Sequence, residues 1–245
     1  MLKIENLFYC PVKSISFSES EVLNIIKDRG VENDRIFAFT QNLDSHQIKN
    51  FEISPQLRKL NNFITLKNTP ELNQYNFVFN KDQLSLKKNI HNIISINPYV
   101  KDEQLLLSNQ IKKLLKKNKK IHFIMDKKNP FFDTMPNKSI SLINKNSLND
   151  FKNKINTEIE FERFRANIYI NGLNAWEERK WVGKTIEINN IKFLVTNEIP
   201  RCSATNLQPH TDNVTMNLPN QLKKIYDHIN MGIYLTPIND GYISV

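Results

Sequence analysis

One of the two cysteines of this chain, Cys202, lies in the stretch EIPRCSAT, directly after an arginine and two residues after a proline. A cation beside a cysteine favours the thiolate form. A thiolate is both a nucleophile and a soft ligand for metals that prefer sulfur. Taken alone, Cys202 therefore has three interpretations: an inert buried thiol, a nucleophile or a metal ligand.

The net charge of +9 is concentrated in one segment. Residues 112–128 contain eight lysines and one aspartate, and they account for seven of the nine net positive charges. The segment has no arginine and only one aromatic residue, Phe123, whereas nucleic-acid-binding surfaces interleave both with lysine. We interpret it as a solvated helix face, with a surface for an anionic partner as the alternative. A basic nucleic-acid-binding barrel is the least favoured class.

Several common cofactor motifs are absent from the sequence. The chain has 5 glycines and contains neither GxGxxG nor GxxxxGK[ST]. Its 5 histidines form no HExxH motif, and none pairs with a cysteine at the spacing of a zinc site. Two cysteines are too few for an iron–sulfur cluster. We expect no haem, flavin or iron–sulfur cluster in this chain.

The sequence also indicates a compartment. No apolar run approaches the roughly 18 residues of a membrane span, and the first residues lack a signal-peptide pattern. Two cysteines do not make a disulfide framework. These features predict a cytoplasmic protein without a membrane span.

Strand patterns outnumber helix patterns and show no regular βαβ alternation, which favours a β-rich α+β fold with barrel-like sheets. The main expected helices cover residues 102–120, a short segment capped by Asn146 or Ser147 with Leu148, Phe151 and Ile155 on one face, and residues 218–229. The last of them is expected to bury Leu222, Ile225, Tyr226 and Ile229. The expected strands include 35–41, 62–68, 76–87 (short strands around a polar turn), 139–143, 161–170, 184–197 (a pair about Asn189-Asn190) and a final pair at the C-terminus.

Five short motifs follow one another in the chain: PVKS (11–14), NDR (33–35), RFRANI (163–168), WEERKW (176–181) and IPRCSATNLQP (199–209). Together they resemble the MOSC family, the molybdenum cofactor sulfurase C-terminal domain. The N-terminal part resembles the β-barrel module that precedes this domain in the mitochondrial amidoxime-reducing component and its bacterial relatives. The resemblance covers about residues 2–245.

The resemblance implies a MOSC domain over residues 119–245, preceded by a smaller β-barrel module over residues 1–118, that together bind the pterin-based molybdenum cofactor. Cys202 matches the family's molybdenum ligand, and we expect it to be the metal-binding and catalytic residue. Residues expected to bind the cofactor are Lys13, Ser14, Arg35, Asn144, Arg165, Asn167 and Arg201. Basic side chains among them would meet the phosphate of the cofactor. The alternatives are that Arg35 and Arg165 form structural ion pairs and that Lys13 is simply exposed.

The resemblance further implies an oxidoreductase that reduces N-hydroxylated or N-oxide small molecules. Its electrons would come from a separate ferredoxin- or flavoprotein-like donor, for which the lysine-rich segment 112–128 is a candidate docking surface. Pyridoxal phosphate binding is a further family-level association. Asn206 and Gln208 stand where the family usually has Thr and Asp, so the resemblance does not fix the substrate. The alternative is a non-catalytic carrier of the cofactor, or of sulfur as a persulfide on Cys202.

Overall fold

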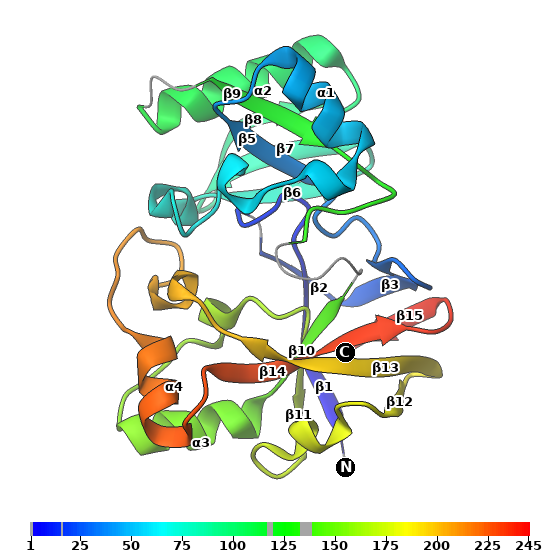
Figure 1. The fold of residues 1–245 in the computed structure, drawn as a ribbon, viewed down its shortest axis with the longest axis vertical. Coiled ribbons are helices and arrows are strands. Elements are labelled where there is room, and N and C mark those ends of the chain that lie inside the picture. Colours follow the sequence, from blue (N-terminus) through cyan, green and yellow to red (C-terminus); the bar gives the residue numbers. More distant parts are fainter. Residues whose placement is uncertain (1, 16, 117–119, 133–138) are drawn as a thin grey trace. The chain divides into compact units, whose positions relative to one another are not determined.

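The computed structural model describes residues 2–15, 17–116, 120–132 and 139–245 (Figure 1). The chain divides into two compact units, each discontinuous in sequence. Unit 1 comprises Met1–Tyr9, Glu19–Glu32 and Met135–Val245, and unit 2 comprises Cys10–Ser18 and Asn33–Thr134. The expected module boundary between residues 118 and 119 lies outside the described residues and stays a prediction.

The centre of unit 1 is a seven-stranded sheet with the strand order β12-β13-β14-β10-β11-β1-β2. Its strands are β1 (Lys3–Tyr9), β2 (Ser18–Ser20), β10 (Ile140–Asn144), β11 (Ile168–Asn171), β12 (Thr185–Ile188), β13 (Ile191–Pro200) and β14 (Asn230–Pro237). Strands β10 and β11 are parallel, whereas β11 with β1, β10 with β14, and β13 with β12 and β14 are antiparallel. A second sheet has the order β15-β3-β4, with β3 (Val22–Ile26), β4 (Gly30–Val31) and β15 (Gly241–Ser244).

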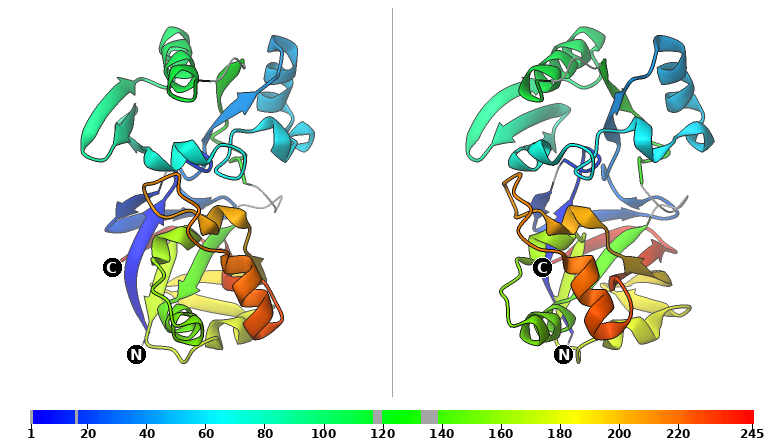
Figure 2. Two further views of the ribbon diagram at one scale, coloured as in Figure 1. Left: turned by 90° about the vertical axis from the view of Figure 1, so that its left-hand side faces the viewer. Right: turned by 60° about the vertical axis from the view of Figure 1, so that its left-hand side comes forward.

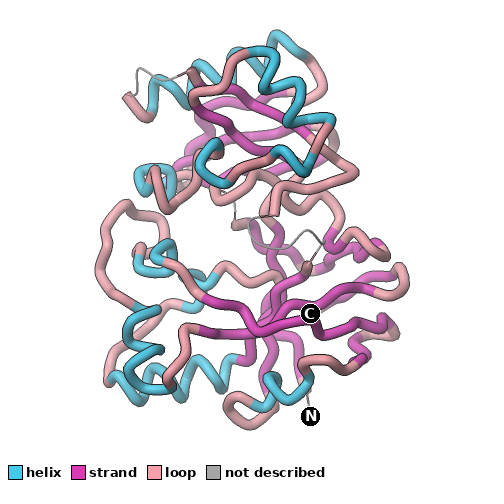
Figure 3. Tube along the Cα trace, in the orientation of Figure 1, coloured by secondary structure: helices cyan, strands magenta, loops and turns pink. Residues whose placement is uncertain are grey.

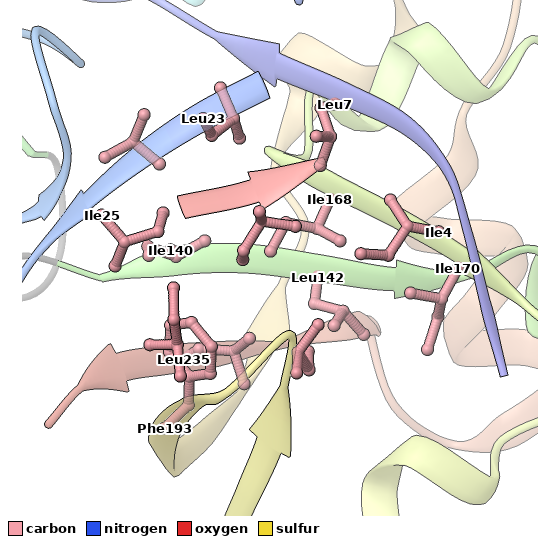
Figure 4. Packing of buried hydrophobic residues seen from close by; sticks show 14 of the residues in the cluster. Ile4, Leu7, Leu23, Ile25, Ile140, Leu142, Ile168, Ile170, Phe193 and Leu235 are labelled. Atoms are coloured by element: carbon pink, nitrogen blue, oxygen red, sulfur yellow. The ribbon is translucent and has the colours of Figure 1, made fainter. Parts of the chain in front are cut away.

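The strands of unit 1 enclose one large aliphatic core (Figure 4). Alternate side chains of β11, Ile168 and Ile170, point into it, as period-two strand geometry requires. Leu142, Phe193 and Leu235 join them from three further strands. This core fixes the strands whose ends carry the candidate site.

Two helices complete unit 1 and lie side by side (Figure 2): α3 (Lys145–Ile155) and α4 (Leu218–Tyr226). Helix α3 packs against β10 and β11. Helix α4 buries Leu222, as expected, but Ile225 and Ile229 are 37% and 38% exposed, so their predicted burial is wrong. The helix ends at Asp227, whose left-handed φ of 60° turns the chain away before Ile229.

The described residues of unit 2 form a two-stranded and a three-stranded sheet, two α-helices and short 3-10 helices between residues 55 and 74 (Figure 3). Its elements are β5 (Phe37–Gln41), β6 (Asn76–Asn80), β7 (Gln83–Lys88), β8 (His91–Ile96), β9 (Ile121–Met125), α1 (Ser45–Ile53) and α2 (Lys101–Leu114). Strand β5 pairs with β9, and β6, β7 and β8 form a meander. Helix α2 packs against β8 and β9, and a second core contains Phe51, Phe63 and Phe131.

The prediction of a β-rich α+β fold is confirmed, and among the described residues the sheets are open in strand order. Three local expectations are wrong. Residues 62–68 form no strand: they contain the end of a 3-10 helix, one isolated bridge from Phe63 to Thr40 and a turn at 66–68. Residues 161–164 form a 3-10 helix instead of the start of a strand, and β15 pairs with β3 instead of β14. Helix α1 was not expected because it buries only Phe51; a capping box of Asp44 and Gln47 defines its start. No described helix is both long and apolar enough to cross a membrane.

Candidate functional site

Cys202 lies immediately beyond the end of β13, at the N-terminus of a 3-10 helix, η6 (Ser203–Asn206). Its thiol is exposed, whereas that of Cys10 is buried. The carbonyl of Cys202 accepts hydrogen bonds from the backbone N–H of Thr205, at 3.1 Å, and from its hydroxyl, at 2.8 Å. These bonds close a tight turn, so a fixed backbone presents the thiol at the surface.

Arg201, the residue before the cysteine, turns its side chain into the protein. Its Nε donates to the carbonyl of Met231 at 2.8 Å, and its Nη1 donates to the carbonyl of Phe164 at 2.9 Å. Its Nη2 also donates to Met231, and burial lowers the pKa of the guanidinium. All three guanidinium nitrogens therefore bind backbone carbonyls, and binding of the cofactor by this side chain stays a prediction.

Arg163, which was not among the expected site residues, binds from the RFRAN motif to the backbone of the cysteine loop. Its Nη1 donates to the carbonyl of Asn206 at 3.1 Å, and its Nη2 donates to the Thr215 hydroxyl at 2.9 Å. Its Nε donates to Glu160 at 2.6 Å. The RFRAN motif and the cysteine loop are thus held together by one arginine from each. An arginine within a motif was visible in the sequence, but its burial was not.

Arg165 lies at the end of the 3-10 helix η4 (Phe161–Phe164) in the left-handed conformation, with a φ of 51°, and is half-buried. Hydrogen bonds with the buried Tyr169 stabilise the loop that contains Arg165. The Tyr169 hydroxyl donates to the carbonyl of Phe161 at 2.8 Å and accepts from the N–H of Ala166 at 3.1 Å. The hydrogen bonds of Arg163 and Arg201 join the loop of the RFRAN motif to the cysteine loop. Of the expected cofactor-binding residues in unit 1, Arg165 and Arg201 are the two that lie in these loops.

Asn167 is 1% exposed, and its side-chain hydrogen bonds connect it to two other strands. Its side-chain oxygen accepts from the N–H and hydroxyl of Ser141, at 3.1 and 2.9 Å, and its amide donates to the carbonyl of Phe8 at 3.1 Å. This side chain connects β1, β10 and β11 directly behind the Arg165 loop. Its expected contact with the cofactor stays a prediction.

Asn144 is also fully buried and belongs to a separate polar network. Its amide donates to the Glu178 carboxylate at 3.1 Å and to the carbonyl of Asn174 at 2.8 Å. The hydroxyl of Ser147 donates to the same carboxylate at 2.7 Å. Burial raises the pKa of Glu178, while these two donors oppose that rise. Glu178 belongs to the WEERKW motif, but only the structure identifies it as a buried carboxyl group.

The other three expected residues, Lys13, Ser14 and Arg35, lie in unit 2, where the PVKS and NDR motifs meet. The backbone N–H of Arg35 donates to the carbonyl of Cys10 at 2.6 Å, and the Arg35 guanidinium pairs with Asp34. Ser14 is half-buried with a φ of 64°. The structure therefore brings the two motifs together within this unit.

Lys13 is 2% exposed, so the alternative that it is simply exposed is wrong. Its Nζ donates to the carbonyl of Phe131 at 2.9 Å and lies 5.2 Å from the ring centre of Phe63. Burial, together with the charges of Arg35 and Arg58, lowers the pKa of Lys13 to about 7. A cation of this kind is stabilised by an anionic group.

The described residues offer few protein ligands to a metal ion. Among the described residues, no group of three or more His, Cys, Asp or Glu side chains could hold a metal ion. Cys202 supplies one exposed sulfur, and sulfur is a donor that softer transition metals prefer. A cofactor that brings its own metal ligands needs only one from the protein, so this donor set fits such a cofactor.

A sequence model of the MOSC domain matches residues 118–245, just over half of the chain. The chain therefore belongs to the MOSC domain family, which is associated with binding of the molybdenum cofactor. No protein of curated function matches the chain. Among solved structures, it is similar to the crystal structure of the YuaD protein from Bacillus subtilis, with 12% identity and a TM-score of 0.44 over 100% of this chain and 92% of that one.

Proposed function

We propose that this MOSC protein is a molybdenum-cofactor-dependent oxidoreductase and that Cys202 is the protein ligand of the metal. The observation that carries the proposal is the exposed Cys202 thiol on a loop held from both sides, within the part of the chain that matches the family. When bound, the cofactor would supply two-electron redox chemistry coupled to oxygen-atom transfer.

The chain's own residues would hold and orient the cofactor. Arg201 and Arg163 fix the backbone on the two sides of Cys202, so that the sulfur is preorganised for a metal. Arg165, in its left-handed loop, is the best placed cation of unit 1 for an anionic pterin substituent. From unit 2, we propose Lys13, Ser14 and Arg35 as further cofactor-binding residues.

The proposed substrates are N-hydroxylated or N-oxide small molecules. Two electrons from a donor protein and two protons from water would cleave the N–O bond, converting R–NH–OH to R–NH₂ and water. The donor is oxidised and the substrate reduced, and the oxygen leaves as water.

For the donor, we propose an acidic redox protein that binds the lysine-rich surface. We define this surface by the exposed lysines at positions 112, 113, 116, 120, 127 and 128; residues 117–119 of the segment lie outside the described residues. Reversing Lys112 and Lys113 to Glu is expected to slow electron transfer at low salt, because it removes electrostatic attraction. The matched control reverses the exposed Lys180 and Lys184. Equal rates in both variants would remove this docking surface.

The test of cofactor binding is elemental and pterin analysis of protein from a host that makes the cofactor. We expect near-stoichiometric molybdenum in the wild type and in Cys10→Ala, whose replaced thiol is buried. Cys202→Ser is expected to retain pterin with an altered metal signal. Neither molybdenum nor pterin in the wild type, where a related enzyme acquires both, would refute the proposal.

The exposure of Cys202 also favours a second candidate function, a carrier of sulfur as a persulfide. Such a carrier would transfer sulfur from Cys202 and would reduce no N-hydroxylated compound with any electron donor. Assays with a reduced dye and with a sulfur acceptor separate the two functions.

A further inference from the structure

His228 lies between α4 and β14, in a half-buried cluster of polar and aromatic side chains. Its Nε2 is 2.8 Å from the Nη1 of Arg179, and its Nδ1 faces the backbone N–H of Asn230 at 3.2 Å. Its ring stacks on that of Tyr226, with the centres 5.8 Å apart, and meets the edge of Trp176 at 5.9 Å. Both ring nitrogens therefore face donors, and both ring contacts are aromatic.

This arrangement disfavours the protonated ring. A guanidinium and a backbone N–H can only donate, so each of them needs an unprotonated nitrogen as its acceptor. A neutral imidazole can accept one of the two hydrogen bonds, whereas an imidazolium can accept neither. Burial and the charge of Arg179 lower the pKa of His228, in agreement with this geometry.

The charged groups around His228 come from four elements. Glu198 on β13 accepts from the Nε of Arg179 at 2.8 Å and from the side chain of Asn230 at 2.7 Å. Asp227 at the end of α4 favours the protonated ring, as does Glu198, whereas Arg179 opposes it. Asp150 on α3 faces the cluster through its hydrogen bonds with Trp176 and Tyr226. The balance between Arg179 and the two acidic groups sets the charge of His228.

The segment that follows His228 holds the residue before the candidate ligand. The carbonyl of Ile229 accepts from the backbone N–H of Arg201 at 2.9 Å. The carbonyl of Met231 accepts from the Arg201 guanidinium at 2.8 Å. Cys202 follows directly, so a displacement of residues 228–231 is transmitted to its backbone.

We propose that neutral His228 is a positioning residue for Cys202, and that protonation of its ring displaces residues 228–231 and loosens the backbone at Arg201. The imidazolium cannot accept from Arg179 or Asn230, and it turns toward Glu198 or Asp227. The role in holding a cofactor ligand rests on the proposed function, whereas the link from His228 to Arg201 is a property of the chain alone.

The test is amide hydrogen exchange of the full chain by NMR, with rates corrected for the intrinsic effect of pH. The protection factor of the Arg201 N–H is expected to fall about tenfold or more between about pH 7.5 and about pH 5.5. The N–H of Val195, which donates to Lys184 at 2.9 Å within the same unit, is the internal reference and should stay constant. A constant protection factor at Arg201 would overturn the inference.

Variants assign the effect to this histidine. In His228→Gln, which keeps a neutral acceptor, protection at Arg201 should change less than about twofold over the same pH range. The matched control, His122→Gln, replaces a histidine of unit 2 whose pKa is also lowered by burial, and it should keep the wild-type fall. Persistence of the fall in His228→Gln would also overturn the inference.

Two further variants keep the test decisive if His228→Gln does not fold. Arg179→Gln should move the midpoint of the fall to higher pH, and Glu198→Gln should move it to lower pH, because these groups shift the His228 equilibrium in opposite directions. Shifts in one common direction would contradict the proposal. The exchange data do not require bound cofactor. If the protection factor of the Arg201 N–H depends on pH but the protein binds no molybdenum, only the proposed function is refuted. If the protein binds molybdenum but this protection factor does not depend on pH, only this inference is refuted.

Discussion

The guanidinium of Arg163 donates to the backbone carbonyl of Asn206 at 3.1 Å, across 43 residues of sequence. In return, Arg201 donates to the carbonyl of Phe164 at 2.9 Å. Each loop thus supplies an arginine that satisfies the backbone of the other. Because both acceptors are backbone carbonyls, this pairing of the two loops depends on the Arg163 and Arg201 side chains as its donors.

Arg163→Met is expected to lower the free energy of unfolding by about 3 kcal/mol, because it leaves the carbonyl of Asn206 and the hydroxyl of Thr215 without their donor. Arg163→Lys should not restore the lost stability, since one ammonium group cannot occupy the positions of the three guanidinium nitrogens. Urea unfolding measures both. The control is Lys152→Met, whose partner Glu158 is 91% exposed and whose loss should cost less than about 0.5 kcal/mol. Wild-type stability in Arg163→Lys would contradict the pairing.

Gly232→Ala is expected to destabilise the protein by several kcal/mol, about 3 or more, because it overpacks the main sheet. A Cβ at Gly232 would lie 2.4 Å from the carbonyl oxygen of Leu142 and 2.6 Å from the side chain of Ile143. Gly183→Ala is the matched control: φ is 82° there and 81° at Gly232, but no atom lies within 4 Å. It should cost only about 1 kcal/mol of backbone strain. Equal losses would show that φ, and not close approach, governs both sites.

Glu178→Gln tests the buried carboxyl group. Burial raises the pKa of Glu178 above 4.5, so the folded state holds this proton more tightly than the unfolded state. The contribution of protonated Glu178 to the stability of the folded state is therefore complete below pH 4.5, and it is lost as the pH rises through the raised pKa. The stability of Glu178→Gln relative to wild type should increase over that range in urea unfolding. The exposed Glu187→Gln should show no such trend, and a flat difference for Glu178→Gln would contradict the pKa shift.

Lys13→Met tests the buried cation of unit 2. Burial and the neighbouring Arg35 and Arg58 lower the pKa of Lys13 from 10.5 to about 7. Between these values the unfolded chain binds a proton that the folded chain does not, so wild-type stability should rise with pH. In Lys13→Met this rise should be reduced, whereas the exposed Lys49→Met should retain it. Identical slopes in all three proteins would place the Lys13 pKa near its ordinary value.

Some features could be predicted from the sequence because they depend on neighbouring residues. The hairpin of β12 and β13 turns at Asn189 and Asn190, both with positive φ, which asparagine tolerates. The α3 helix was recognised from the spacing of its apolar residues. Helix α1 was missed because a single buried phenylalanine gives no helical pattern.

The β-rich class, the family and the position of Cys202 in a short polar loop follow from the sequence, since motifs and strand periodicity are local properties. The folded chain, in contrast, is needed to see that Arg201 turns inward, that Lys13 and Glu178 are buried, and that Arg163 binds the cysteine loop. The direction and burial of a charged side chain depend on which carbonyls and carboxylates the fold brings beside it. Met231, which binds Arg201, and Phe131, which binds Lys13, lie 30 and 118 residues away in the chain, beyond the reach of any local pattern.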